Sequence, residues 1–190
     1  LTIEQCQKLM AYLEESHPEW CCYFAITLFA GIRPDTTNGE MWELARCVER
    51  DGIETYFSNH HFHLTEEITK EGEERKTHAS KNLEAWLKAY PPTPDAICPG
   101  LPKIFTPLRK MFQLPHDGLR HTAISAFMSL GKDYSDAADE FAIGINAFVR
   151  QHRCIGSRQL QRDQDAAWPS LDLLFQCRVA DEFALVHFDE

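Results

Sequence analysis

The sequence predicts a mainly α-helical protein that carries a small three-stranded antiparallel β-sheet. Three observations lead to this fold class. Apolar residues recur at helical spacing in several segments, beginning with Cys6, Leu9 and Leu13. Three short strand-like runs between residues 53 and 79 are separated by turn signals. Glycine and proline residues stand at the ends of the predicted helices, as is typical of helix termination.

The first two helices are predicted within residues 2–30. Thr2 and Gln5 form a capping-box pattern, in which each side chain satisfies a free backbone N–H group at a helix start. The first helix ends before Pro18, and a strongly apolar second helix covers residues 20–30. Gly31 follows at the position where a left-handed residue commonly ends a helix.

The β-sheet is predicted in the middle of the chain. Residues 35–50 are polar with a helical pattern, and Asp51-Gly52 is a turn signal. Strands are predicted at residues 53–57, 62–69 and 75–79. An acidic turn at residues 71–74 joins the last two strands, so Lys70 is expected near a hairpin turn.

Further helices are predicted after the sheet. They cover residues 82–90, 104–114 with an interruption at Pro107, 119–130 and 134–143. Residues 171–175 and 179–186 fit a helix or a strand equally well. We therefore expect one domain over residues 1–153 and an acidic C-terminal extension over residues 154–190.

The composition limits the class of protein. The 190 residues have a formal net charge of −10, and seven acids stand against one arginine between Asp163 and Glu190. This balance disfavours generic DNA binding, although a local basic site remains compatible with it. Seven scattered cysteines suit a reducing cytoplasm, and no apolar run approaches the length of a membrane span. Because the chain begins with Leu1, we expect it to be a fragment of a longer protein.

Arg120 is the first candidate site residue. It lies in the first turn of the helix predicted at residues 119–130, where free N–H groups and the helix dipole favour an anion. A guanidinium there indicates a phosphate site. The alternative is an ion pair with a carboxylate such as Asp117.

Several short motifs occur in a characteristic order. Gly31-Ile32-Arg33-Pro34 ends the second helix, Ile68-Thr69-Lys70 lies in the sheet, and Leu119-Arg120-His121-Thr122 begins a later helix. Residues 82–87 supply a further element between the last two. In this order, residues 1–153 resemble the catalytic domain of the tyrosine recombinases, the phage-integrase family. The resemblance implies DNA binding, DNA integration and site-specific recombination.

The resemblance also implies roles for individual residues. In the family two arginines neutralise the scissile phosphate, a lysine protonates the leaving oxygen and a tyrosine attacks phosphorus. Arg33 and Arg120 match the two arginines and Lys70 matches the lysine. His121 is expected either to support the residues that contact the phosphate or to pack against its helix. His116 would act as the preceding histidine if the loop shifts it by one residue.

The sequence departs from the family pattern at four positions. Thr36 stands where an acidic residue usually orients the first arginine, and Asp117 stands where the preceding histidine is usual. The later Gly-His element reads Gly144-Ile145-Asn146. Arg153 lies near the expected tyrosine slot, and no tyrosine follows Tyr134. We therefore expect an inactive site without a nucleophile.

Three interpretations remain open from the sequence. The first is a degenerate recombinase domain that binds a DNA phosphate through Arg33, Lys70 and Arg120. A homo-oligomer on DNA is compatible with this interpretation. The second is an enzyme with an unusual nucleophile or an engineered residue 153. The third is a non-catalytic protein-interaction module on the same scaffold. No membrane partner, small-molecule cofactor or metal is expected, and His60, His61 and His63 are interpreted as strand-face residues rather than ligands.

Convergence of the two arginines separates these interpretations. Guanidiniums that share one phosphate lie within roughly 8 Å of each other. Arg33 and Lys70 also have non-functional interpretations. Arg33 could cap helix-end carbonyls, and Lys70 could be a solvated lysine among acids. Arginines that point apart, or that are tied to Asp117 and the acids at residues 71–74, would indicate a scaffold without DNA chemistry.

Overall fold

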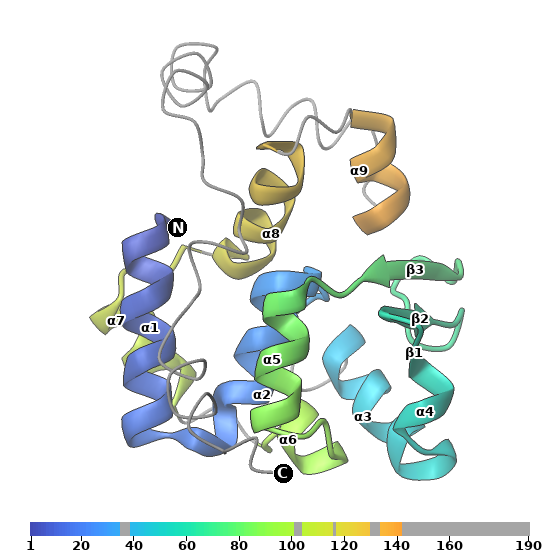
Figure 1. Cartoon of the computed structure of the whole chain (residues 1–190), viewed down its shortest axis with the longest axis horizontal. Helices are drawn as coiled ribbons and strands as arrows, with labels where there is room; N and C mark the ends of the chain where they lie inside the picture. The colour runs from blue at the N-terminus through green and yellow to red at the C-terminus, as the bar shows by residue number, and fades with distance from the viewer. Residues whose placement is uncertain (35–38, 101–103, 116, 130–133, 142–190) are drawn as a thin grey trace, which may run out of the picture.

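The computed structural model describes residues 1–34, 39–100, 104–115, 117–129 and 134–141. In this part of the chain the protein is mainly helical with one three-stranded antiparallel sheet, which confirms the predicted fold class at this level (Figure 1). The elements in chain order are α1 (Ile3–Ser16), η1 (Pro18–Trp20), α2 (Cys21–Ala25), η2 (Ile26–Ala30), α3 (Glu40–Asp51), α4 (Ile53–Tyr56), β1 (Phe57–Ser58), β2 (His61–Leu64), β3 (Arg75–His78), α5 (Lys81–Ala89), α6 (Pro94–Ile97), α7 (Phe105–Met111), α8 (Gly118–Ser129) and α9 (Tyr134–Phe141).

Helix α1 forms for the reasons that its sequence indicates. The Thr2 hydroxyl accepts a hydrogen bond from the Gln5 backbone N–H at 3.2 Å, and the Gln5 side chain accepts one from the Thr2 N–H at 2.8 Å. The predicted capping box is therefore confirmed. The apolar stripe of α1, which includes Leu9 and Leu13, is buried in the main core.

The predicted second helix consists of three consecutive helical segments, η1, α2 and η2. The last of them, η2, is a π-helical turn, and Gly31 ends it with φ +62°. A Cβ at Gly31 would lie 2.6 Å from the Phe141 ring. Glycine is therefore required here both by the left-handed backbone and by the close approach of α9.

The sheet has the order β1-β2-β3, with both neighbouring pairs antiparallel. Ser58 pairs with His61, so the β1–β2 hairpin turns through the two residues Asn59 and His60. Their φ angles are +49° and +63°, the signature of a type I′ turn. In β2 the residues alternate between half-buried and buried, which places Phe62 in the core.

Two predicted strands are wrong in part. Residues 53–56 form the short helix α4, and only Phe57–Ser58 pairs as β1. The helical turn buries Tyr56, whose hydroxyl donates to Asp51 at 2.5 Å, and this tertiary contact overrides the local strand pattern. Strand β2 ends at Leu64, because the N–H groups of Ile68 and Thr69 bond back to the Thr65 carbonyl in a turn.

The predicted interruption of the 104–114 helix at Pro107 is also wrong. Pro107 is the third residue of α7, where its missing N–H removes no intrahelical hydrogen bond. The predicted helix ends beyond Phe141 and the predicted C-terminal extension lie outside the described residues.

The elements pack into two apolar clusters. The larger one joins α1, α2, η2, α3, the sheet and α5, while a smaller one joins α8 and α9 through residues such as Ile124 and Phe141. In Figure 1, α8 lies above the ends of α2 and α5, and α9 lies above β3. The end of η2 and the starts of α3, β3 and α8 consequently meet in one region.

Candidate functional site

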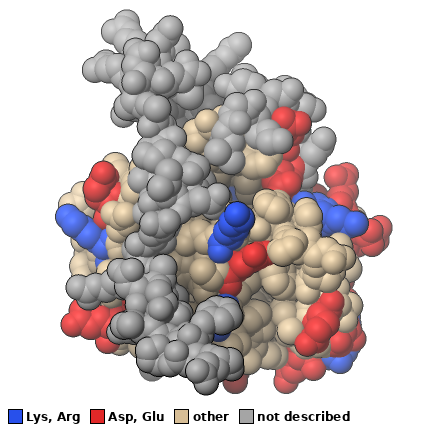
Figure 2. Space-filling view, viewed as in Figure 1, with Lys and Arg blue, Asp and Glu red and all other residues tan. Residues whose placement is uncertain are grey.

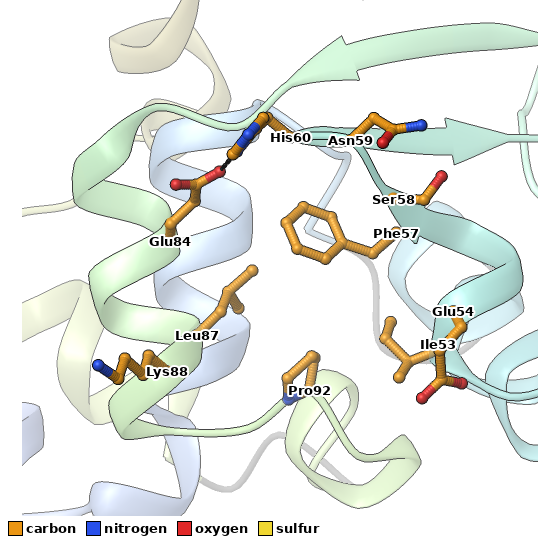
Figure 3. A pocket seen from close by; sticks show the side chains of 10 residues that line it. All are labelled: Ile53, Glu54, Phe57, Ser58, Asn59, His60, Glu84, Leu87, Lys88 and Pro92. Carbon is orange, nitrogen blue, oxygen red and sulfur yellow. Dashed lines mark hydrogen bonds and ion pairs between the residues drawn. The ribbon is translucent and has the colours of Figure 1, made fainter.

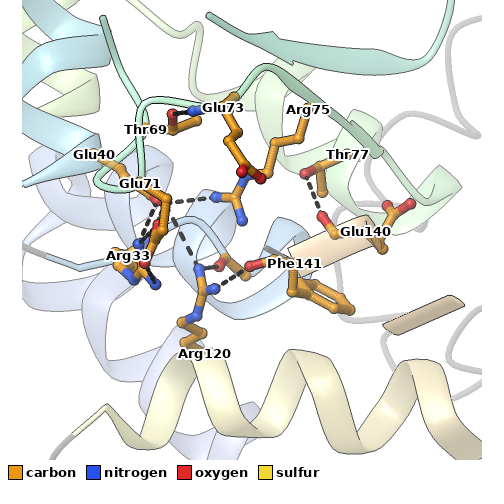
Figure 4. Close-up of polar contacts among 11 residues, drawn as sticks. Arg33, Glu40, Thr69, Glu71, Glu73, Arg75, Thr77, Arg120, Glu140 and Phe141 are labelled. Atoms are coloured by element: carbon orange, nitrogen blue, oxygen red, sulfur yellow. Dashed lines mark hydrogen bonds and ion pairs between the residues drawn. The ribbon is translucent and has the colours of Figure 1, made fainter. Parts of the chain in front are cut away.

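Three arginines from distant parts of the chain surround one buried carboxylate. Arg33 follows η2, Arg75 begins β3 and Arg120 lies in the first turn of α8. All three are within ion-pair distance of Glu40, the first residue of α3 (Figure 4). We call Arg33, Arg75, Arg120 and Glu40 the arginine cluster.

Glu40 is the centre of the cluster. Its side chain is 1% exposed, and its position at the start of α3 lets the helix dipole stabilise its negative charge. One carboxylate oxygen accepts from Arg33 Nη1 at 3.0 Å. The other accepts from the Arg33 backbone N–H at 3.0 Å and from Arg75 Nη2 at 2.5 Å, with Arg120 Nη1 3.6 Å away. Glu40 thus compensates buried positive charge from three directions.

Arg33 is the member of the cluster that reaches the surface, with 25% of its side chain exposed. Its Nη1 and Nη2 also donate to the two carboxylate oxygens of Glu71, at 2.5 and 2.7 Å, in a bidentate pair. Partial burial lowers the pKa of Arg33, but the bonds to Glu71 and the charge of Glu40 outweigh it and raise the pKa overall. The side chain therefore pairs with glutamates instead of capping helix-end carbonyls.

Arg120 takes the carbonyl-capping role that was considered for Arg33. Its Nη1 donates to the Gly31 carbonyl at 2.7 Å, and its Nη2 donates to the Phe141 carbonyl. Arg120 consequently ties the end of η2 to the end of α9. Burial, followed by the nearby Arg75 charge, lowers the pKa of Arg120 to about 10, so it stays protonated at neutral pH.

Arg75 is the most deeply buried arginine of the cluster, with 3% of its side chain exposed. Its Nη2 bonds Glu40, but its Nε and Nη1 have no hydrogen-bond partner among the residues that the structure describes. Burial lowers the pKa of Arg75, against the opposing charge of Glu40. Unpaired buried donors are costly, and they mark a position where an acceptor would be stabilised.

Lys70 and Glu71 occupy the turn between β2 and β3. The Thr69 hydroxyl fixes the base of this turn by donating to the Glu73 carbonyl at 2.8 Å and accepting from the Glu73 N–H at 3.0 Å. Glu71 faces Arg33, whereas the adjacent Lys70 is exposed. The lysine thus lies next in sequence to a residue that touches the cluster.

The remaining predicted site residues have different outcomes. His121 is half-buried in the first turn of α8, and its backbone N–H donates to the Asp117 carbonyl at 2.9 Å. His116 and Arg153 lie outside the described residues, as does Thr36. The structure therefore brings Arg33 and Arg120 to one carboxylate, but it also ties Arg33 to Glu71, one of the acidic partners that would indicate a scaffold without DNA chemistry. His116 and the expected tyrosine slot are not among the described residues.

Sequence reasoning missed Glu40 and Arg75. In the family pattern an acidic residue at position 36 would orient Arg33. Here Glu40, four positions after Thr36, supplies that carboxylate. Its signal was the Gly39-Glu40 start of a helical pattern, because acids are favoured in a first turn. Arg75 carried a weaker signal as the first residue of a predicted strand, in a position that faces the core.

The positive and negative charges of the site nearly cancel. Three guanidiniums stand against Glu40 and Glu71, which leaves one net positive charge, and Glu140 adds a further negative charge near Arg75. On the face shown in Figure 2, lysine and arginine side chains lie among acidic ones and form no continuous basic patch. The cluster therefore offers little long-range attraction to a polyanion.

Apart from the arginine cluster, a hollow of about 630 Å³ lies between α4 and α5. Ile53, Phe57 and Leu87 supply apolar walls, and His60 contacts Glu84 at its edge (Figure 3). Its lining residues differ from those of the arginine cluster. Its apolar walls suit an apolar group better than a phosphate.

No protein-family model, curated protein or solved structure matches the chain. The resemblance to tyrosine recombinases accordingly depends on the residues described above. In the part of the chain that the structure describes, no helix has the length and apolar character needed to cross a membrane. Over the same residues, no group of three or more His, Cys, Asp or Glu side chains is arranged to hold a metal ion.

Proposed function

We propose that this chain binds a DNA phosphate at the arginine cluster, on a scaffold related to the catalytic domain of the tyrosine recombinases. In this proposal Arg33 is the phosphate ligand at the surface, Lys70 approaches from the neighbouring turn, and Arg120 holds the site together. The domain binds without cleaving, because the sequence offers no tyrosine near residue 153.

One observation carries the proposal. Arg33 and Arg120 were expected to share a phosphate, and their Nη1 atoms lie 3.0 and 3.6 Å from the two oxygens of a single carboxylate. Such proximity is costly for two cations unless an anion lies between them. Glu40 already balances part of that charge, and 25% of the Arg33 side chain is exposed, although both of its terminal nitrogens are bonded to Glu71.

The chemistry available to this arrangement is electrostatic binding. A planar guanidinium donates two parallel hydrogen bonds to two oxygens of a phosphate. Without an in-line nucleophile the phosphodiester bond remains intact, since charge neutralisation alone does not supply an attacking group. We therefore expect reversible DNA binding and no covalent protein–DNA adduct.

The test is fluorescence anisotropy of a labelled DNA duplex at low salt. We expect Arg33→Gln to weaken binding about fivefold or more and to reduce the dependence of log K on log salt by about one unit. Arg46→Gln is the matched control, because Arg46 is an exposed arginine on α3 that pairs with Glu43 at 2.9 Å. Equal duplex affinities of the two variants would contradict the proposal.

A second candidate is a protein-interaction module on the same scaffold. Two observations favour it: the net charge of −10 and the carboxylate of Glu71 seated on Arg33. In that case duplex affinity is weak and is unchanged by Arg33→Gln and by Arg120→Lys. The same titration therefore distinguishes the two candidates.

A further inference from the structure

We propose that Glu71 is an internal competitor for phosphate, whose carboxylate occupies the position on Arg33 that a phosphodiester would take. The inference depends on the proposed function, because it describes how that same site is closed. It predicts that an anion binds only after the tip of the β2–β3 turn moves away from Arg33.

The geometry of the Arg33–Glu71 pair supports a substitution of one anion by the other. Two guanidinium nitrogens donate to two oxygens of one planar group, at 2.5 and 2.7 Å. Arginine binds the non-bridging oxygens of a phosphate in the same two-to-two arrangement. A phosphate oxygen pair and the Glu71 carboxylate therefore require the same donors and exclude each other.

The charges support the same substitution. A phosphodiester carries one negative charge, as does an ionised glutamate. Exchange of one for the other at Arg33 therefore leaves the net charge of the cluster unchanged. By contrast, a phosphate that bound while Glu71 stayed in place would be repelled by a carboxylate at close range.

Arg75 provides an independent sign that a further acceptor can be accommodated. Its side chain is 97% buried, yet within the described part of the chain its Nε and Nη1 have no hydrogen-bond partner. Glu71 interacts electrostatically with Arg75 without hydrogen bonding to it.

The base of the turn has more hydrogen bonds than its tip, where the Gly72 N–H donates to the Thr69 carbonyl at 3.2 Å. The two hydrogen bonds between Thr69 and Glu73 hold the base. At the tip, Glu71 is 41% exposed and Gly72 has φ +69° with open space around it. Lys70 is exposed beside Glu71, so a rearranged tip can replace the acid near Arg33 with a base.

The experiment compares Glu71→Gln with Glu74→Gln. Both substitutions remove one negative charge from the same exposed turn, but only Glu71 contacts Arg33. We expect Glu71→Gln to bind a labelled DNA duplex about tenfold more tightly than the wild-type chain, and Glu74→Gln to differ by at most about twofold. Melting temperatures in inorganic phosphate and in chloride of equal ionic strength provide a second readout, with a larger phosphate shift in Glu71→Gln.

The double variant Glu71→Gln/Arg33→Gln tests whether the gain acts through Arg33, and it should lose the gain. Circular dichroism of each variant verifies that it is folded. If the wild-type chain binds duplex through Arg33 and Glu71→Gln binds no more tightly than Glu74→Gln, the inference fails while the proposed function stands. If neither the wild type nor Glu71→Gln binds duplex or phosphate, both fail. Binding by Glu71→Gln alone supports the inference.

Discussion

Glu40→Gln is the substitution that tests the arginine cluster most directly. The variant keeps the shape of the side chain and removes its charge. Glu40 is 1% exposed and lies within 3.6 Å of three guanidiniums, so its loss leaves buried positive charges without an opposing one. Breaking a buried ion pair in this way costs about 3–5 kcal/mol. The glutamine oxygen can still accept one hydrogen bond, so we expect a loss near the lower end, about 3 kcal/mol.

The assay is urea denaturation at neutral pH, read as the free energy of unfolding at constant slope. Glu43→Gln on the same helix is the control. Glu43 pairs with Arg46 at 2.9 Å, but that arginine is 53% exposed. An exposed pair of this kind contributes at most about 1 kcal/mol. A Glu40→Gln loss no larger than that of Glu43→Gln would refute the argument that Glu40 neutralises the cluster.

A double-mutant cycle locates the effect within the cluster. In the Glu40→Gln background, Arg75→Met removes the deepest of the unpaired charges and should recover part of the lost stability. In the wild-type background the same Arg75→Met should destabilise, because it leaves Glu40 with fewer cations. Additive effects of the two substitutions would indicate that Glu40 and Arg75 do not depend on each other.

Further predictions concern two glycines, the His60–Glu84 contact and the pH dependence of Glu71. Gly31→Ala should lower the free energy of unfolding by more than about 2 kcal/mol, because the new methyl group lies on a left-handed backbone, 2.6 Å from the Phe141 ring. Gly72→Ala has φ +69° but open surroundings, so it should lower the stability measured by thermal unfolding by only about 1 kcal/mol. His60→Gly should raise stability by about 0.5 kcal/mol by relieving φ +63° in the type I′ turn. Glu84→Gln, which changes only the contact between the exposed His60 ring and Glu84, should leave the melting temperature unchanged within about 1 °C. The bonds from Arg33 hold the pKa of Glu71 below its ordinary value. The stabilising contribution of Glu71 is therefore present at neutral pH and is lost as the pH falls through that lowered pKa. Chemical denaturation from about pH 5 downward should show a steeper loss of unfolding free energy for the wild type than for Glu71→Gln.

The helices were largely predictable because their signals are local. The capping box at Thr2, the apolar stripe of α1 and the glycine at position 31 each depend on residues within a few positions. The strand prediction is wrong over residues 53–56 because Tyr56 packs into the core through α4, a preference set by its neighbours in space. The length of β2 failed for a related reason, since the Thr65 carbonyl ends the strand by starting a turn.

The candidate site divides in the same way. By itself the sequence determined that Arg33 and Arg120 stand at helix boundaries, since helix starts and ends are encoded by nearby residues. Only the tertiary structure decided that Glu40 lies between them, that Arg75 joins them and that Glu71, not Lys70, faces Arg33. Burial and ion pairing depend on residues distant in the chain, and a turn can present either of two adjacent side chains to the same guanidinium.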